Sequence, residues 1–257
     1  MLNCFDLTGK TAFITGGSQG LGKGFAKAFA QSGANLFLVA RSEDKLIKAC
    51  EEMKSYGVEC ALAIADITDE DAIKNAVDAC VARFGKIDAL INNAAAGSSP
   101  VLLEDYPVPE WRKVMDTNIT GMFIVAKQVG IQMIKQQSGK MVIVTSIAGK
   151  VFHPFNIPGA YETSKEALNA LIRALAHDWA KHNINVNGIA PGYFLSEINQ
   201  EFCEANPTAE KALSELTAMG RWGNPDEIGP LGVFLCSDAA SYMQGSIVTM
   251  DGGRTFR

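Results

Sequence analysis

The sequence predicts an α/β protein of one domain, in which a doubly wound and mostly parallel seven-stranded sheet carries helices on both faces. Short apolar segments rich in branched residues alternate with amphipathic segments along the chain, and this alternation is typical of parallel sheets. A glycine-rich turn joins the first apolar segment to the helical segment after it. The 257 residues show no shift in composition that would mark a domain boundary, so a single domain, residues 1–257, is expected.

The strands of the sheet are predicted from seven short segments of mostly apolar residues. Segments of this length and composition are typical of strands that are buried on both faces. The first six are residues 11–15, 35–40, 60–65, 88–92, 140–146 and 184–190, and a weaker seventh is 246–250.

Helical segments are predicted between the strands, where apolar residues recur every three or four positions. The clearest examples are residues 70–84 and 160–181, each with one continuous apolar stripe. Because crossovers between parallel strands are right-handed, this alternation places helices on both faces of the sheet.

The longest irregular segment is predicted at residues 191–207, directly after the sixth strand. Ligands of open parallel sheets bind at the carboxyl ends of the strands, which is where this segment would lie. A long loop at that edge favours a substrate loop or lid over a linker, and we predict that the lid covers residues 191–217.

Composition and charge argue against several functional classes. Hydrophobic residues make up 47% and charged residues 20% of the chain, as in soluble globular proteins, and the net charge is −5 without a basic cluster. This balance argues against nucleic-acid binding and against electrostatic binding to a membrane. The N-terminus lacks the pattern of a signal peptide, and no apolar run reaches the roughly 18–20 residues of a membrane span, so a cytoplasmic location is expected.

The six cysteines and three histidines show no spacing that is typical of a metal site. No two cysteines form a CxxC motif, and all six are scattered over predicted helices and strands. Small buried thiols in a reducing compartment are the simplest interpretation, and no metal ion is expected.

The segment TGGSQGLG, residues 15–22, lies between the first predicted strand and the first predicted helix. Gly16, Gly20 and Gly22 permit a tight turn and a close approach of the backbone to a phosphate group. The amide groups and the dipole at the start of the helix attract such an anion. Glycines also occur in ordinary turns, but their position between a strand and a helix predicts a dinucleotide-binding (Rossmann) turn.

Tyr161 and Lys165 are four residues apart in a predicted helix and therefore lie on the same helix face. A nearby ammonium group favours the phenolate and lowers the pKa of a phenol, which is about 10 for the free side chain. A lowered pKa would make Tyr161 a proton donor and acceptor near neutral pH. By itself this pair is more typical of two surface residues that meet by chance than of a catalytic pair.

Six motifs in a fixed order resemble those of the short-chain dehydrogenase/reductase family over essentially the whole chain. They are TGGSQGLG at 15–22, NNAA at 92–95, TSIAG at 145–149, YETSK at 161–165, PGYFLS at 191–196, and a C-terminal segment that contains RWGNPDEIGPLGVFL and DGG. The resemblance implies an oxidoreductase that transfers a hydride between a nicotinamide cofactor and a secondary alcohol or ketone. It also makes Tyr161 and Lys165 a predicted catalytic pair.

The resemblance implies a catalytic set of four residues, which are Asn118, Ser146, Tyr161 and Lys165. Tyr161 would exchange a proton with the substrate oxygen, while Lys165 lowers the pKa of Tyr161 and hydrogen-bonds the nicotinamide ribose. Ser146 ends a predicted strand and would hold the substrate oxygen near Tyr161, although a cap of the next turn is the simpler role for this serine. Asn118 would hold a water that passes protons to Lys165, but a hydrogen-bonded core asparagine fits its apolar helix stripe as well.

The resemblance also implies the cofactor contacts. Asp66 would bind the adenine, and Pro191 and Gly192 would lie beside the nicotinamide. Ser196 stands where the family usually has a threonine that contacts the carboxamide. The implied set is Gly16, Ser18, Gln19, Gly20, Leu21, Gly22, Arg41, Ser42, Asp66, Ile67, Asn93, Ala94, Tyr161, Lys165, Pro191, Gly192 and Ser196.

The end of the second predicted strand favours NADP (NADPH) over NAD as the cofactor. NAD is usually recognised there by an acidic residue, but this sequence has Ala40 followed by Arg41. Arg41 and Ser42 are suited to bind the additional 2′-phosphate of NADP, although they also fit the solvated start of a helix that Ser42 caps. Gln19 stands where many NADP-binding relatives have a basic residue, so residual use of NAD is expected.

The sequence constrains the substrate, a small alcohol or ketone, only loosely. The motifs RWGNPDEIGPLGVFL and NGIAPGYF are similar to those of polyol and sugar-acid dehydrogenases of the gluconate 5-dehydrogenase type. Reduction of a 3-oxoacyl thioester is the alternative. The lid contributes the apolar residues Tyr193, Phe194, Leu195 and Phe202. Residues 193–207 contain no Arg or Lys to bind a sugar acid, which weakens the sugar interpretation.

Two departures from the family pattern lie close to the predicted site. Ala95 replaces the usual glycine of NNAG and adds a methyl group near the cofactor. Ser146 precedes Tyr161 by two residues more than is usual, and the extra length lies in 150–159. Phe152, His153 and Phe155 of that segment are therefore candidates for substrate contacts and, equally, for loop packing.

The resemblance implies a homotetramer, since relatives pair through helices that here hold residues 110–135 and 160–181 and through a C-terminal segment near 225–257. Small residues in the second helix, Ala167, Ala170 and Ala174, permit close approach of another helix. A non-catalytic dinucleotide-binding module is the alternative from another functional class. The complete catalytic set argues against it, because a sensor has no need of all four residues.

Overall fold

The computed structural model describes residues 3–97, 99, 101–151 and 159–256. Within them, seven strands form one sheet in the order β3-β2-β1-β4-β5-β6-β7, and every neighbouring pair is parallel. The strands are β1 (Thr11–Thr15), β2 (Asn35–Ala40), β3 (Cys60–Ile64), β4 (Ala89–Asn92), β5 (Gly139–Val144), β6 (Ile184–Pro191) and β7 (Ile247–Met250). The predicted doubly wound sheet is thus confirmed, and it is wholly rather than mostly parallel.

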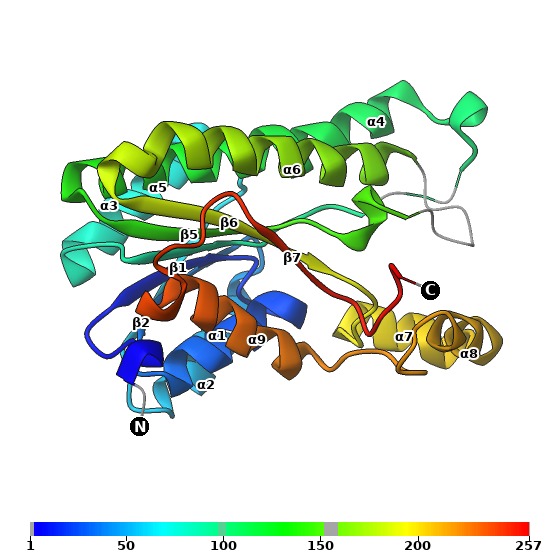
Figure 1. Ribbon diagram of the computed structural model, residues 1–257, viewed down its shortest axis with the longest axis horizontal. Helices are drawn as coiled ribbons and strands as arrows, with labels where there is room; N and C mark the ends of the chain where they lie inside the picture. Colours follow the sequence, from blue (N-terminus) through cyan, green and yellow to red (C-terminus); the bar gives the residue numbers. More distant parts are fainter. Residues whose placement is uncertain (1–2, 98, 100, 152–158, 257) are drawn as a thin grey trace.

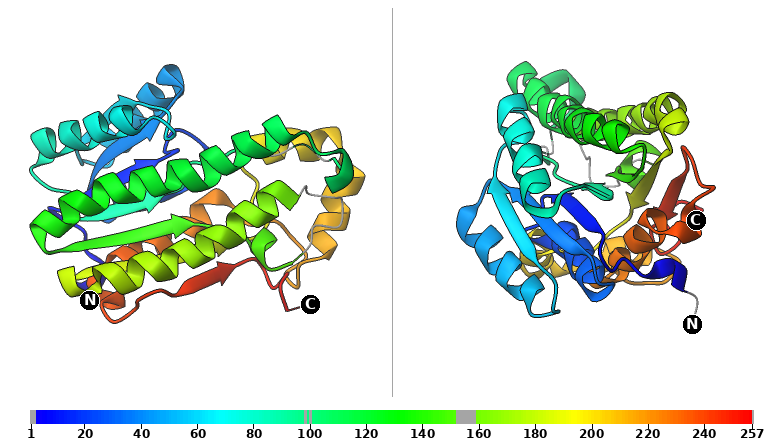
Figure 2. Two further views of the ribbon diagram at one scale, coloured as in Figure 1. Left: turned by 90° about the horizontal axis from the view of Figure 1, so that it is seen from above. Right: turned by 90° about the vertical axis from the view of Figure 1, so that its left-hand side faces the viewer.

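The helices cover both faces of the sheet, as the alternating pattern predicts. Figure 1 shows α1, α2 and α9 below the sheet and α3, α4, α5 and α6 above it, and the end-on view in Figure 2 shows the same three layers. Their bounds are α1 (Gly20–Gln31), α2 (Glu43–Lys54), α3 (Glu70–Phe84), α4 (Val108–Met115), α5 (Met122–Gln136), α6 (Gly159–Trp179), α7 (Glu197–Ala205), α8 (Pro207–Glu215) and α9 (Pro225–Cys236).

Two apolar cores lie on the two faces of the sheet. One joins the sheet to α1, α2 and α9 and contains Phe25 and Phe29, which are fully buried. The other joins it to α3, α5 and α6 and contains Phe13 and Phe37, whose rings stack with centroids 5.5 Å apart. Because adjacent residues of a strand point to opposite faces, a strand between two cores must be apolar throughout, as the short segments are.

Local signals in the sequence set the ends of several helices. Asp69 caps α3 by accepting a hydrogen bond of 2.9 Å from the amide of Ala72, and Gly85 ends that helix with φ of +81°. Asn224 and Glu227 form a capping box at the start of α9. These signals explain why the helix predicted at 70–84 has the predicted bounds.

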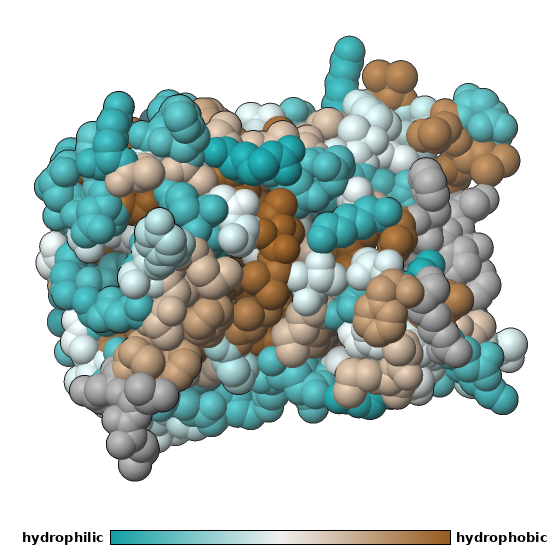
Figure 3. Space-filling view, in the orientation of Figure 1, coloured by the Kyte–Doolittle hydropathy of each residue, from teal (hydrophilic) through white to brown (hydrophobic). Residues whose placement is uncertain are grey.

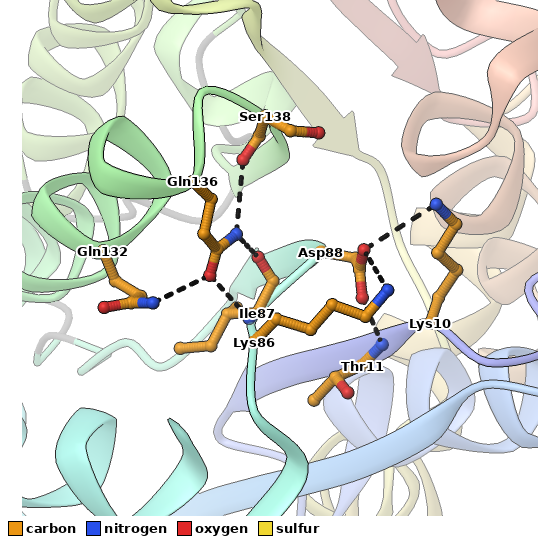
Figure 4. Close-up of polar contacts among 8 residues, drawn as sticks. All are labelled: Lys10, Thr11, Lys86, Ile87, Asp88, Gln132, Gln136 and Ser138. Atoms are coloured by element: carbon orange, nitrogen blue, oxygen red, sulfur yellow. Dashed lines mark hydrogen bonds and ion pairs between the residues drawn. The ribbon is translucent and has the colours of Figure 1, made fainter. Parts of the chain in front are cut away.

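The amino-terminal edge of the sheet is held by a polar cluster that lies away from the predicted site (Figure 4). Asp88 accepts a hydrogen bond of 2.8 Å from the amide of Thr11 and forms ion pairs with Lys10 and Lys86. Gln136 of α5 hydrogen-bonds both backbone groups of Ile87, at 3.0 and 2.8 Å. This cluster fixes the β1–β4 pair, and the carboxyl ends of these two strands lead into the glycine turn and the NNAA segment.

Two sequence predictions of local structure are wrong. Residues 191–207 are not one irregular segment, because β6 extends to Pro191 and α7 occupies Glu197–Ala205, with α8 directly after it. The helix around Asn118 is also not regular, since a π-helical segment, Asp116–Gly121, joins α4 to α5. An additional residue per turn there shifts the register of the apolar stripe, which a fixed period of 3.6 residues cannot predict.

Candidate active site

A cleft of about 500 Å³ opens at the carboxyl ends of the strands and contains nearly all of the predicted site residues. Such a cleft, at the point where the strand order reverses between β1 and β4, is the usual ligand site of this architecture. The predicted residues that line it are Gly16, Ser18, Gln19, Gly20, Leu21, Arg41, Ser42, Asp66, Ile67, Asn93, Ala94, Ser146, Tyr161, Lys165, Pro191, Gly192 and Ser196. Gly22 and Asn118 are buried behind it.

The glycine turn at one end of the cleft is shaped for a phosphate group. Gly16 has a φ of +66°, which favours glycine, and a Cβ at Gly22 would come within 2.0 Å of the Gly16 carbonyl oxygen. Because glycine has no Cβ, Gly22 allows the backbone of Gly16 to lie this close to the start of α1. The first turn of α1 contains no acidic residue, so its amide groups are suited to an anion.

A carboxylate from the lid occupies part of this turn. Glu197, the first residue of α7, accepts a hydrogen bond of 2.7 Å from the amide of Gly20 at the start of α1. No pattern in the sequence indicates this contact, because the two residues are 177 positions apart. Glu197 and its helix neighbour Asn199 both line the cleft and extend the predicted site.

The segment after β2 forms the rim of the cleft beside the glycine turn. Arg41 is 78% exposed, and its guanidinium lies 3.7 Å from the carboxylate of Asp66. Hydrogen bonds from the amide and hydroxyl of Thr68 lower the pKa of Asp66, to which the Arg41 charge adds, so Asp66 is anionic at neutral pH. Ser42 stands at the N-cap position of α2 but its side chain makes no capping hydrogen bond.

Lys45 lines the same rim and was not among the predicted residues. Its ammonium group donates a hydrogen bond of 2.7 Å to the side-chain oxygen of Gln19 in the glycine turn. Lys45 lies four residues after Arg41, in the first turn of α2. That spacing is the one signal in the sequence that would have placed it near the cofactor site.

Tyr161 and Ser146 meet at the other end of the cleft. Ser146 is not the end of β5 but follows it by two residues, where it caps a short turn by accepting a hydrogen bond of 3.1 Å from the amide of Ala148. Burial raises the pKa of Tyr161, and a hydrogen bond with Ser146 opposes that shift. The pKa is therefore shifted in the direction opposite to the one predicted from the spacing to Lys165.

Lys165 lies beneath Tyr161 and is almost completely buried, with 2% exposure. Its ammonium group donates a hydrogen bond of 3.1 Å to the carbonyl oxygen of Val144 and lies 5.5 Å from the centroid of the Tyr161 ring. Burial lowers the pKa of Lys165 to about 8, because desolvation disfavours the ammonium form. At neutral pH the group is still mostly charged.

Asn118 is fully buried and joins three parts of the site. Its side-chain oxygen accepts a hydrogen bond of 2.7 Å from the amide of Ala96, and its amide group donates to the carbonyl oxygen of Ala96 and to the hydroxyl of Ser164. Ser164 in turn donates a hydrogen bond of 2.7 Å to the carbonyl oxygen of Tyr161. Both N–H groups of Asn118 are thus used by the protein, and Ser164 is a further residue that the sequence did not indicate.

The lid is anchored close to the cleft by its first residues. The backbone of Tyr193 and Leu195 pairs with Gly223, and the amide group of Asn199 donates a hydrogen bond of 2.8 Å to the carbonyl oxygen of Phe194. Phe194 lines the cleft, whereas the ring of Tyr193 packs against Trp222 with centroids 5.3 Å apart.

The two departures from the family pattern, the segment 150–159 and Ala95, have different outcomes. Phe152, His153 and Phe155 lie outside the described residues. Ala95 lines the cleft, so its methyl group lies where the family pattern predicts it.

Across residues 3–97, 99, 101–151 and 159–256, no three acidic, histidine or cysteine side chains lie together as a metal-ion site would require. In the same ranges, no helix combines the length and the apolar character needed to cross a membrane.

The chain is similar to a known protein family and to several relatives over nearly its whole length. The family model described as enoyl-(acyl carrier protein) reductase matches residues 16–255. Gluconate 5-dehydrogenase of Gluconobacter oxydans is 35% identical over 98% of this chain and 96% of its own, and a 2-dehydro-3-deoxy-D-gluconate 5-dehydrogenase of Pseudoalteromonas atlantica is 37% identical over 98% of both. A 3-oxoacyl-(acyl-carrier-protein) reductase of rhamnolipid biosynthesis in Pseudomonas aeruginosa is 34% identical over 97% of both.

Solved structures are similar over the whole fold. A short-chain dehydrogenase/reductase from Mycobacterium marinum superposes with a TM-score of 0.94 at 33% identity, covering 100% of this chain and 99% of its own. NAD⁺-bound xylitol dehydrogenase has a TM-score of 0.91 at 33% identity, covering 96% and 99%. A gluconate 5-dehydrogenase from Beutenbergia cavernae with bound NADP has a TM-score of 0.90 at 30% identity, covering 99% and 100%. With the motifs, the parallel sheet and the cleft, these similarities show that the chain belongs to the short-chain dehydrogenase/reductase family and is an oxidoreductase that acts on alcohol or ketone groups.

Proposed function

We propose that the protein transfers a hydride reversibly between NADP(H) and a secondary alcohol or ketone, with Tyr161 as the acid and base. The observation that carries this proposal is the arrangement of Tyr161, Ser146 and Lys165 at one end of a cleft whose other end is the glycine turn. A nicotinamide dinucleotide needs a phosphate-binding turn and a proton donor in one cavity, and this cleft provides both. When it is bound, the nicotinamide supplies or accepts the hydride.

Tyr161 is proposed to give a proton to the substrate oxygen in ketone reduction and to accept it in alcohol oxidation. Because burial raises the pKa of Tyr161, the phenol is protonated at neutral pH and is ready to act as the acid. Ser146 hydrogen-bonds Tyr161 and would hold the substrate oxygen at the same point. The buried charge of Lys165 would stabilise the phenolate that forms after the proton has left.

Asn118 is proposed to position the site and to lie beside the water that passes protons to Lys165. Its hydrogen bonds to Ala96 and Ser164 connect the segment after β4 with the helix that carries Tyr161 and Lys165. Three partners on a buried side chain fix its orientation and that of its neighbours. The side-chain oxygen of Asn118 has two lone pairs, and the amide of Ala96 uses one of them. The other could accept a hydrogen bond from the water.

The cofactor is proposed to be NADP(H), with residual use of NAD(H). The residues that would hold it are the glycine turn and α1 at the phosphates, Asp66 and Ile67 at the adenine, Arg41 and Ser42 at the 2′-phosphate, and Asn93, Ala94, Pro191, Gly192 and Ser196 toward the nicotinamide. Position 40 is an alanine and not an acidic residue, whose carboxylate would repel the 2′-phosphate of NADP. One similar structure is NAD⁺-bound and another has bound NADP, so family membership alone does not decide the preference.

The substrate is proposed to be a polyol or a sugar acid, and residues 191–217 are proposed to form its lid. Relatives named gluconate 5-dehydrogenase and 2-dehydro-3-deoxy-D-gluconate 5-dehydrogenase support this class. Phe194 at the rim of the cleft and a relative named 3-oxoacyl-(acyl-carrier-protein) reductase favour the second candidate, reduction of a 3-oxoacyl thioester.

The experiment is a panel of sugar acids, polyols and 3-oxoacyl thioesters, assayed by cofactor absorbance with NADP(H) and NAD(H). We expect activity on a sugar acid or polyol, a higher kcat/KM with NADP(H), and loss of that preference in Arg41→Ala. A hydrogen bond to a charged group contributes about 1.5–3 kcal/mol, or about 10- to 150-fold, and the exposure of Arg41 favours the lower limit. A wild type that prefers NAD(H), or an unchanged preference in Arg41→Ala, would contradict the proposed cofactor.

A further inference from the structure

We propose that Lys45 is the second cation of the 2′-phosphate site and that Gln19 holds it in place, an inference that rests on the proposed preference for NADP(H). The sequence places Arg41 as the cation of this site and puts the neutral Gln19 where a second cation would be expected. In the fold, a cation reaches the side chain of Gln19 from a different element, α2. Lys45 of α2 thus supplies the second positive charge that the residues of the glycine turn lack.

The contact between Lys45 and Gln19 closes the rim of the cleft. The ammonium group of Lys45 and the side-chain oxygen of Gln19 are 2.7 Å apart, and both residues line the cleft together with Arg41 and Ser42. Gln19 is the N-cap residue of α1, yet its side chain makes no capping hydrogen bond. Its amide oxygen is therefore available for Lys45, and this bond fixes a long, flexible side chain at the cofactor site.

The hydrogen bond to Gln19 leaves most of the binding capacity of Lys45 intact. An ammonium group has three donors, and one is used by Gln19, so two remain for an anion. The amide oxygen of Gln19 carries no charge and does not neutralise Lys45, whereas a carboxylate partner would. The NH₂ group of Gln19 adds neutral donors at the same place.

Arg41 alone is a weak basis for recognition of a phosphate. Its guanidinium is 78% exposed and lies 3.7 Å from the carboxylate of Asp66, which offsets part of its charge. Glu43 and Asp44, in the first turn of α2, do not line the cleft. Among the lining residues of the segments after β2 and β3, Arg41 and Lys45 are two cations against one carboxylate, Asp66. The other lining carboxylate, Glu197, is held at the amide of Gly20. The second cation makes the segments after β2 and β3 net positive, which favours a dianionic phosphate.

Binding of two nucleotides without a nicotinamide tests the inference independently of turnover. Adenosine 2′,5′-bisphosphate and adenosine 5′-monophosphate differ only in the 2′-phosphate, and both are titrated by calorimetry into the wild type, Lys45→Met, Gln19→Met and Arg41→Ala. Lys48→Met is the matched control, because Lys48 is exposed on the same helix and does not line the cleft.

We expect Lys45→Met to weaken binding of the bisphosphate about 5- to 10-fold, at the low end for an exposed charge-assisted hydrogen bond, and to change binding of the monophosphate less than about 2-fold. Gln19→Met should produce a smaller loss of the same kind, and Lys48→Met should resemble the wild type. Equal affinities in Lys45→Met and Lys48→Met, or equal losses for both nucleotides in Lys45→Met, would overturn the inference.

The result also separates this inference from the cofactor proposal. If the wild type prefers the bisphosphate and Arg41→Ala removes the preference while Lys45→Met does not, the cofactor proposal stands and the role of Lys45 fails. If the wild type does not distinguish the two nucleotides, both are wrong.

Discussion

The carboxylate of Glu197 accepts a hydrogen bond of 2.7 Å from the amide of Gly20, and this contact joins the first turn of α7 to the first turn of α1. A phosphate of the cofactor bound at the glycine turn would need the same amide group. Two anions cannot share that donor without repulsion. Binding of the dinucleotide is therefore expected to displace the Glu197 carboxylate from this amide.

Glu197→Gln is expected to tighten binding of the dinucleotide. The change removes the negative charge that competes with the phosphate but keeps the size of the side chain. Charges at an exposed helix N-terminus have effects of about 2- to 5-fold in affinity, so the Kd of NADPH, measured by calorimetry, should fall by that factor. Glu201→Gln, an exposed glutamate on the same helix, is the control and should leave the Kd unchanged. Weaker or unchanged binding in Glu197→Gln would exclude this competition.

Asn118→Ala is expected to destabilise the fold as well as the site. The change leaves the amide and carbonyl groups of Ala96 and the hydroxyl of Ser164 without their buried partner. A buried polar group that loses its partner costs about 1–3 kcal/mol, and a protein of this size loses about 2–4 °C in Tm for each kcal/mol. Thermal unfolding measures the effect against Asn75→Ala, an exposed asparagine of α3. Equal Tm values for the two variants would show that the Asn118 network contributes nothing.

The pH dependence of turnover should reflect the Tyr161–Lys165 pair. Burial lowers the pKa of Lys165 to about 8 and raises the pKa of Tyr161, so the first proton leaves the pair near pH 8. Alcohol oxidation requires a pair that can accept a proton, and ketone reduction requires one that can donate it. The kcat/KM of oxidation should therefore rise with pH through about 8, while that of reduction falls over the same range.

Lys165→Met separates the two groups. Without the lysine, Tyr161 is the group that titrates, and its pKa is raised above the ordinary value of 10.0. The rise of kcat/KM for oxidation should then move from about pH 8 to above pH 10, and its maximal value should be lower. A rise that stays at its wild-type position would show that the pair does not control the proton transfer.

The assembly is predicted to be a homotetramer. β7 is an edge strand with half-exposed side chains, and Figure 3 shows a band of apolar side chains across this face of the molecule, near β7. On the second predicted interface, Ala170 and Ala174 of α6 are exposed and permit close helix packing. Light scattering at micromolar concentration should give four times the mass of the 27.5 kDa chain, and a monomer would contradict the prediction.

The sequence predicts the sheet well because its strands lie between two apolar cores. β1 and β2 have the bounds expected from their apolar segments alone, since a strand buried on both faces leaves little room for polar residues. The lid is different. α7 has nine residues and an apolar side that mixes with polar residues, so a short helix there resembles a loop in sequence.

The site was predictable where one short motif carries it and not where distant elements meet. The glycine turn and the Tyr161–Lys165 pair are local patterns, and both lie in the cleft. The contacts of Lys45 with Gln19 and of Glu197 with Gly20 join residues far apart in the chain. The spacing of Lys45 to Arg41 indicates the side of the cleft on which Lys45 lies, but no local pattern indicates either contact. The sign of the Tyr161 pKa shift also escaped prediction, because residue spacing shows the neighbouring charge but not the burial that outweighs it.

The central claim, that Tyr161 is the acid and base of a hydride transfer, is tested most directly by Tyr161→Phe. The variant removes one hydroxyl and keeps the ring. Dinucleotide binding, measured by calorimetry, should be preserved. Single-turnover kinetics with the best substrate of the panel should show hydride transfer slowed about 10²- to 10⁴-fold, the usual contribution of a general acid or base. A variant that binds the cofactor and keeps more than about a tenth of the wild-type rate would contradict the claim.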